Sequence, residues 1–90
     1  MPRYLVERTF CSHAGVEMVD SHAVDRCAAV ISANFREGVT WIHSFVTTDR
    51  CRSFCLVDSP SPEAIRVAAQ ATALPVDRIT EVRVVDPYFL

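Results

Sequence analysis

Two stretches with helical spacing alternate with four β-prone runs, and this order restricts the possible fold more than any other feature of the sequence. The β-prone runs cover residues 4–10, 39–47, 52–58 and 79–85. A helical stretch lies between the first and second runs, and another between the third and fourth. This β-α-β-β-α-β order is that of the ferredoxin-like arrangement. We therefore predict a single α+β domain over residues 1–90, with two helices on one face of a four-stranded antiparallel sheet.

Local signals mark the ends of both helices. Asp20 or Ser21 can cap the first helix, and Gly38 can end it in a left-handed conformation. Ser61 can cap the second helix, with Pro62 at its first position. The helical spacing predicts one buried stripe on each helix. The predicted buried positions are Val24, Cys27, Ala28, Ile31 and Phe35 in the first helix and Ile65, Ala68, Ala69 and Thr72 in the second.

The second and third β-prone runs are predicted to form a hairpin around a polar turn at residues 48–50. This centre places Phe45 opposite Phe54 and His43 opposite Leu56, and cross-strand partners share a face of the sheet. By the same alternation Trp41 faces the strand end at residue 58. Residues 39–47 are β-prone throughout, so we expect this strand to be buried on both faces.

The sheet face without helices is predicted to carry a large apolar patch. Side-chain alternation assigns to this face Trp41, Phe45, Phe54, Leu56, Val85 and Leu5, together with His43, Glu7, Glu81 and Arg83. Val82 and Val84 are assigned to the helix-covered core. A patch with three large aromatic side chains is too apolar to remain in water. We therefore predict a homodimer in which two sheets pack face to face, as in dimeric α/β barrels.

Composition and charge exclude several partners. The net charge of -2 provides no basic surface for nucleic acid. All nine basic residues are arginine, which excludes catalysis by a lysine side chain. The sequence shows no signal peptide, and no stretch approaches the length of a membrane span. We expect a cytoplasmic protein without a membrane partner and with reduced thiols.

The four cysteines do not have the spacing of a metal motif. Cys51 and Cys55 are four residues apart in a predicted strand, so their Cα atoms would be about 13 Å apart. No C-x-x-C pair is present. Cys27 and Cys55 are predicted to be buried thiols.

His43 is the first candidate for a functional residue. It is predicted to lie on the open face, where neighbouring strands carry Glu7 and Glu81. A structural role is a hydrogen bond from the imidazole to a carboxylate inside an interface. The functional alternatives are a metal ligand or a general base. Imidazole with carboxylates and water suits nickel, copper or zinc, and a six-coordinate site of mixed ligands favours nickel.

Cys11 and His13 form a second possible metal contact, in a predicted loop. Two ligands two residues apart are also common in ordinary surface loops. Both interpretations are kept for this pair.

Several segments resemble a family of small nickel-binding proteins formerly catalogued as a domain of unknown function. The resemblance is carried by YLVER (4–8), GVTWIHSFV (38–46), FCLVDSP (54–60), SPEAIR (61–66) and LPVDRITEVRVVDPYF (74–89). The tryptophan, histidine and serine of the family pattern fall on Trp41, His43 and Ser44, and its cysteine falls on Cys55. Some members carry a histidine where this chain has Ala68.

The resemblance implies a ferredoxin-like fold, a homodimer and nickel binding with a role in sequestration or detoxification. The sequence is therefore compatible with three functions. The first is a nickel-binding homodimer with His43 and either Glu7 or Glu81 as ligands. The second is a cofactor-independent enzyme, similar to cyclases or monooxygenases, acting on a small apolar molecule held in the dimer cavity. The third is a dimeric interaction module whose polar residues fix the pairing.

Overall fold

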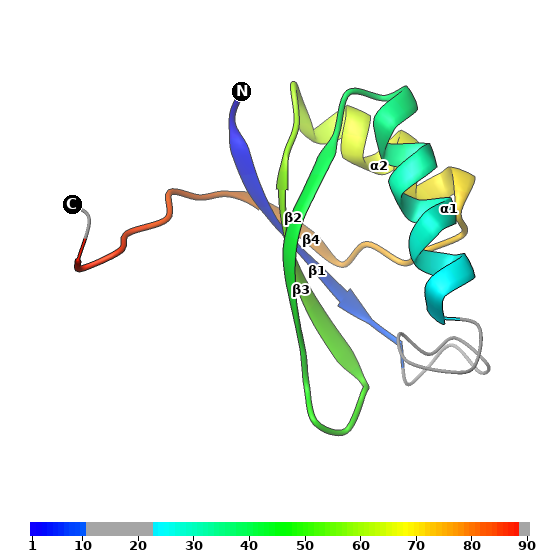
Figure 1. Ribbon diagram of the computed structural model, residues 1–90, viewed down its shortest axis with the longest axis horizontal. Coiled ribbons are helices and arrows are strands. Elements are labelled where there is room, and N and C mark those ends of the chain that lie inside the picture. The colour runs from blue at the N-terminus through cyan, green and yellow to red at the C-terminus, as the bar shows by residue number, and fades with distance from the viewer. Residues whose placement is uncertain (11–22, 89–90) are drawn as a thin grey trace.

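The computed structural model describes residues 1–10 and 23–88, with side chains omitted for 23–26. The elements are β1 (Arg3–Thr9), α1 (Ala23–Arg36), β2 (Thr40–Val46), β3 (Arg52–Asp58), α2 (Pro62–Ala71) and β4 (Arg78–Glu81). The strands form one antiparallel sheet in the order β2-β3-β1-β4. Both helices lie on the same face of this sheet (Figure 1). The predicted α+β, ferredoxin-like fold is confirmed.

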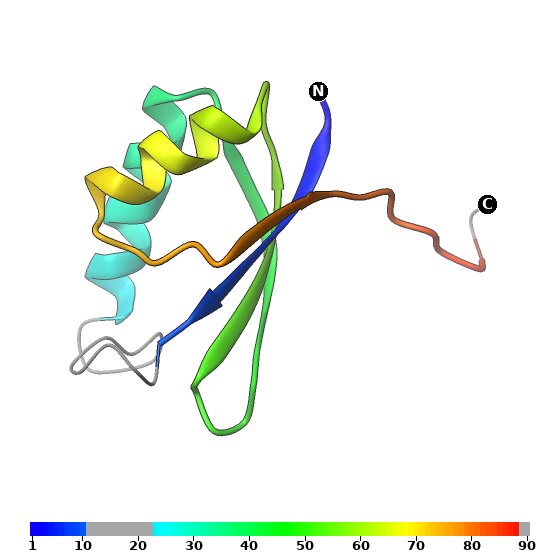
Figure 2. The ribbon, with the colours of Figure 1, turned by 180° about the vertical axis from the view of Figure 1, so that it is seen from behind.

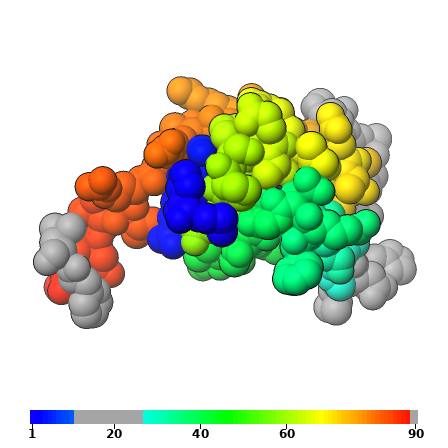
Figure 3. Space-filling model, turned by 90° about the horizontal axis from the view of Figure 1, so that it is seen from above, coloured from blue at the N-terminus to red at the C-terminus, as the bar shows by residue number. Residues whose placement is uncertain are grey.

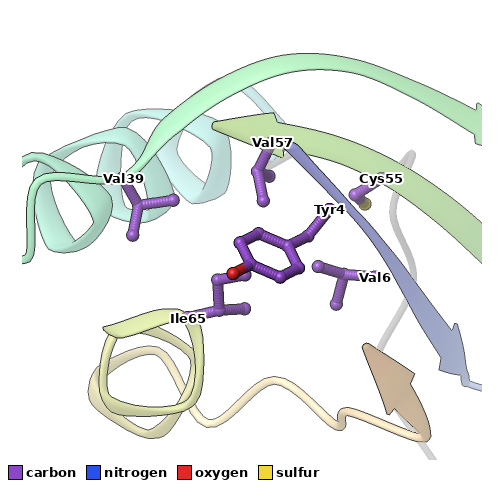
Figure 4. Close-up of a cluster of buried hydrophobic side chains, with 6 residues drawn as sticks. All are labelled: Tyr4, Val6, Val39, Cys55, Val57 and Ile65. Atoms are coloured by element: carbon purple, nitrogen blue, oxygen red, sulfur yellow. The ribbon is translucent and has the colours of Figure 1, made fainter. Parts of the chain in front are cut away.

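A cluster of buried side chains joins the sheet to the helix layer. Tyr4 and Val6 of β1 point into this cluster, and Cys55 and Val57 of β3 lie beside them (Figure 4). Ile65 of α2 packs on them from the other side and is 3% exposed. Because exposure alternates along β1, the residues between its buried positions face away from the helices.

The second helix begins and packs as the sequence predicts. The Ser61 side chain accepts a hydrogen bond from the Ala64 backbone N–H at 3.2 Å, and Pro62 opens the helix. Ala68 and Ala69 are buried together with Ile65. These residues therefore form the stripe that faces the sheet.

The first helix is rotated relative to the predicted stripe. Ile31 and Phe35 were expected in the core but are 55% and 82% exposed, and Ala28 is exposed as well. Ala33 is buried instead, at 3% exposed. Ala33 therefore marks the side of α1 that faces the interior of the protein. The predicted caps at residues 20 and 21 lie outside the described residues, whereas Gly38 has the predicted positive φ of 72°.

Strand β2 is an edge strand and not the doubly buried strand that its composition predicts. It lies at one end of the sheet, and most of its side chains are exposed. The helices cover only one face, so the β-prone residues of β2 are left accessible on the other face and along the edge. Neither helix in the described part of the chain has the length and apolar character needed to cross a membrane.

Strand β4 is shorter than predicted and ends at Glu81 instead of residue 85. The Val82 N–H still donates to the Arg3 carbonyl at 2.9 Å. Beyond this point the neighbouring strand has ended, and Pro2 has no N–H to donate. Val84 was predicted to be buried but is 53% exposed, because no strand remains to pair with it.

Replacing Ile65 by alanine tests the core. We expect Ile65→Ala to lower the free energy of unfolding by about 2–5 kcal/mol, because it leaves a cavity between α2 and the sheet. Val67→Ala is the matched control on the same helix, since Val67 is 47% exposed, and it should change stability by less than about 0.5 kcal/mol. Urea unfolding of both variants measures the difference. Equal losses would contradict this description of α2.

Candidate metal centre on the open sheet face

Two rows of side chains cross the open face of the sheet. In one row, Leu5 of β1 pairs with Leu56 of β3, which pairs with His43 of β2. In the next row, Glu7 pairs with Phe54, which pairs with Phe45. The predicted hairpin register and the predicted open-face positions of these six residues are confirmed.

Trp41 does not lie on the open face as predicted. A β-bulge between Trp41 and His43 shifts the register, so that Trp41 pairs with Val57 and not with residue 58. Trp41 therefore packs against the buried core cluster, and its indole N–H donates to the Ser44 hydroxyl at 2.7 Å. The bulge places Trp41 and His43 on opposite faces of the same strand.

Glu81 also lies on the face of the sheet opposite to the one predicted. It pairs with Tyr4, whose side chain is buried beneath the helices, and cross-strand partners share a face. Arg83 and Val85 were predicted beside Glu81 on the open face but lie beyond the end of β4. Within one chain, Glu81 therefore does not join His43.

Glu7 is engaged by a residue that the sequence did not single out. Arg52 of β3 lies 3.4 Å from the Glu7 carboxylate and places its guanidinium 5.0 Å from the centre of the Phe54 ring. Residues 52 and 54 share a face because they are two apart in one strand, which is the signal that could have identified Arg52. A cation that binds Glu7 has to compete with this arginine.

A second ion pair lies at the other end of the open face. The Arg3 Nε–H donates to the Asp58 carboxylate at 2.8 Å, and a second bond from the guanidinium is 3.3 Å long. This hydrogen-bonded guanidinium holds the pKa of Asp58 below its ordinary value, although partial burial raises it. Asp58 therefore stays ionised and paired, which makes it a poor metal ligand.

His43 lies exposed on the edge strand β2, next to an aromatic ring. The imidazole meets the Phe45 ring edge-on, with the ring centres 4.9 Å apart and an angle of 79° between the planes. Across residues 1–10 and 23–88, no three His, Cys, Asp or Glu side chains lie together as a metal site. The surface thus offers one accessible imidazole with carboxylates at a distance.

The predicted pair Cys11 and His13 lies outside the described residues. Cys27 and Cys55 are free thiols, and Cys55 is buried as predicted. Cys51, however, is disulfide-bonded, which contradicts the expectation that all the thiols are reduced. That expectation came from the assumed compartment and not from the geometry of the chain.

Residues 4–82 match the family described as nickel responsive protein SCO4226-like. The chain belongs to this family. The SCO4226-like fold is also found in the crystal structure of SCO4226 from Streptomyces coelicolor A3(2), with a TM-score of 0.72 and 18% sequence identity. The similarity covers 93% of this chain and 99% of that one. No curated protein matches the chain.

Replacing Arg3 in this SCO4226-like chain tests the ion pair with Asp58. A carboxyl whose pKa is lowered by folding stabilises the protein above its unfolded pKa, and this contribution is lost as the pH falls through the folded pKa. We expect Arg3→Gln to be less stable than the wild type at neutral pH, with the difference vanishing in acid once Asp58 is protonated. Denaturant unfolding of both proteins over a pH series measures it. A difference that does not change with pH would contradict this assignment.

Proposed function

We propose that this protein binds Ni²⁺ on the open face of its sheet, with His43 as the principal ligand. The family is described as nickel responsive, and imidazole nitrogen is a good ligand for this ion. His43 is the only histidine in residues 1–10 and 23–88, and it is exposed on the surface where a second copy would dock. This exposed imidazole is the observation that carries the proposal.

The remaining ligands come from a second copy in this proposal. His43 and Glu7 lie in neighbouring rows with β3 between their strands, so two strand spacings, about 10 Å, separate them across the sheet. Face-to-face packing of two sheets would bring the Glu7 carboxylate of one copy toward His43 of the other. Nickel binding and homodimerisation would therefore strengthen each other. Cys11 and His13 stay predictions as further ligands, whereas Glu81 lies on the other face of the sheet.

Sequestration is the role that we propose for the bound metal. A site on a surface that closes when two copies meet would withhold the ion from other ligands. The cytoplasm remains the predicted compartment, although the disulfide at Cys51 is of a type more common in oxidising compartments.

Replacing His43 tests the metal site. We expect the wild type to take up Ni²⁺ with micromolar or tighter affinity, and His43→Ala to weaken binding by more than about tenfold, since even the loss of a residue that only supports a ligand costs about tenfold to a hundredfold. Thr40→Ala, at another exposed position of β2, should leave binding unchanged. Calorimetric titration with Ni²⁺, Co²⁺ and Zn²⁺ measures the affinities. Absence of micromolar uptake by the wild type would refute the proposal.

Replacing Arg52 tests the role of Glu7. If Glu7 binds the metal, its ion pair with Arg52 opposes binding, so Arg52→Gln should tighten Ni²⁺ binding and Glu7→Gln should weaken it. Arg66→Gln is the matched control, because Arg66 is an exposed arginine paired with Glu63 on α2 at 3.7 Å. The same titrations apply. If neither the Glu7 nor the Arg52 variant changed the affinity for Ni²⁺, Glu7 would not be a ligand of the metal.

A further inference from the structure

Arg8 is a buried cation without a counter-charge among the described residues. It lies in β1, on the face covered by the helices, and is only 8% exposed. Its Nε atom is buried and has no hydrogen-bond partner, and none of the ion pairs within residues 1–10 and 23–88 includes this arginine. A guanidinium stays charged in proteins, and burying a charge without a partner is strongly unfavourable. This position therefore requires a negatively charged partner.

The two ends of β1 differ in the partner that the neighbouring strand supplies. At one end Arg3 faces Asp58 of β3, and the two side chains form an ion pair at 2.8 Å. Figure 3 looks onto this end and shows the first residues of the chain packed against residues near position 60. At the other end Arg8 faces Ser53, which carries a hydroxyl and no charge. Strand β3 thus neutralises the first arginine and leaves the second without a carboxylate.

The neighbours of Arg8 on its face of the sheet supply one hydroxyl in apolar surroundings. Cross-strand partners share a face, so the fully buried Ser53 lies beside Arg8. Within the described part of the chain, the hydroxyl of Ser53 has one contact, at 3.8 Å from the Cys55 sulfur. Phe10, two residues further along the chain, is 1% exposed. A guanidinium and a hydroxyl are therefore held close together where little water reaches them.

The carboxylates that lie near this part of the sheet are directed elsewhere. The Asp77 backbone N–H donates to β1 at 2.8 Å, which places Asp77 beside Arg8. Its carboxylate, however, accepts a hydrogen bond from the Thr9 hydroxyl at 2.5 Å, and Thr9 points to the opposite face of β1 from Arg8. Glu81 shares the face of Arg8 but pairs with Tyr4, four residues or about 13 Å away along the strand. Neither carboxylate is therefore placed to balance Arg8.

A helix end adds to the positive charge at this end of the molecule. Helix α1 begins at Ala23, and its first turn lies close to the end of β1 in both Figures 1 and 2. The N-terminus of a helix carries a partial positive charge and attracts anions. Arg8 is the last but one residue of β1, so the guanidinium and the start of α1 both favour an anion at the same end of the core.

We propose that Arg8 anchors a binding site for a small carboxylate at this end of the core. One guanidinium carries one positive charge, so a monoanion neutralises it, whereas a phosphate dianion would leave a buried negative charge. A carboxylate also matches the paired N–H groups of a guanidinium, and the Ser53 hydroxyl can donate to it as well. Because Arg8 and His43 lie on opposite faces of the sheet, this site is independent of the proposed nickel site.

Titration of the full chain with acetate tests the site. We expect acetate to shift the NMR signal of the Arg8 Nε–H group, which is assigned by its loss in Arg8→Gln. This variant should bind acetate at least about tenfold more weakly, because charge-assisted hydrogen bonds are lost, and Ser53→Ala should show a smaller loss. Arg36→Gln is the matched control, since Arg36 is an exposed arginine of α1, and it should bind acetate like the wild type. Circular dichroism verifies that each variant is folded.

Inorganic phosphate at the same ionic strength is the competing probe. Acetate binding that is equal in Arg8→Gln and the wild type overturns the site. A wild type that shows no acetate-dependent shift of the Arg8 signal also overturns it, and phosphate that binds more tightly than acetate overturns the choice of a carboxylate.

Urea unfolding provides a second test that needs no bound ligand. Arg8→Met removes a buried charge without a partner, so in chloride buffer this variant should unfold at a higher urea concentration than the wild type. Added acetate should raise the unfolding midpoint of the wild type and leave that of Arg8→Met unchanged. The residues between β1 and α1 include two carboxylates, Glu17 and Asp20. If Arg8→Met and either Glu17→Gln or Asp20→Asn lowered the midpoint equally, Arg8 would be paired within the chain and the inference would fail.

Discussion

Both helices lie on one face of the sheet, and the rest of the structure depends on this constraint. Each helix connects two parallel strands, and right-handed crossovers place both connections on the same side. The hydrophobic core therefore lies between the helices and one face of the sheet. The opposite face keeps its apolar side chains, with Phe45 62% exposed. In the proposed homodimer, a second copy would cover this surface without a further layer of chain.

The charged residues of the open face limit what that surface can bind. Arg3 with Asp58 and Arg52 with Glu7 each satisfy a carboxylate at the margin of the apolar rows. These two pairs engage the Asp58 and Glu7 carboxylates of the open face, whereas His43 has no such ion pair among the described residues. In the proposed site, His43 would therefore be the first ligand available to a transition metal, for which imidazole is a suitable donor.

Local patterns predicted those parts of the fold that local chemistry determines. Ser61 caps α2 and Phe45 pairs with Phe54 because a capping side chain and a short hairpin are set by neighbouring residues. The orientation of α1 was missed because apolar residues occur around most of that helix, so Ile31 and the truly buried Ala33 fit the helical period equally well. The end of β4 was missed because it depends on where a strand distant in sequence begins.

The candidate site was likewise predicted only in part. His43 and Glu7 were placed on the correct face because simple alternation holds for β3 and β1. Trp41 was assigned to the wrong face of the sheet because no residue pattern in its own segment predicts a β-bulge. Arg52 was overlooked because its contact with Glu7 depends on the pairing of β1 with β3, which joins residues 45 positions apart.

The bulge in β2 has a consequence for how this family is compared. One extra residue at Ile42 allows Trp41 to remain under the helices while His43 faces outward. A relative that lacks this insertion would expose its tryptophan or bury its histidine, even if both residues were present in the same order. Within the family, a shared tryptophan and histidine therefore indicate a shared surface only when the residue count between them is also kept.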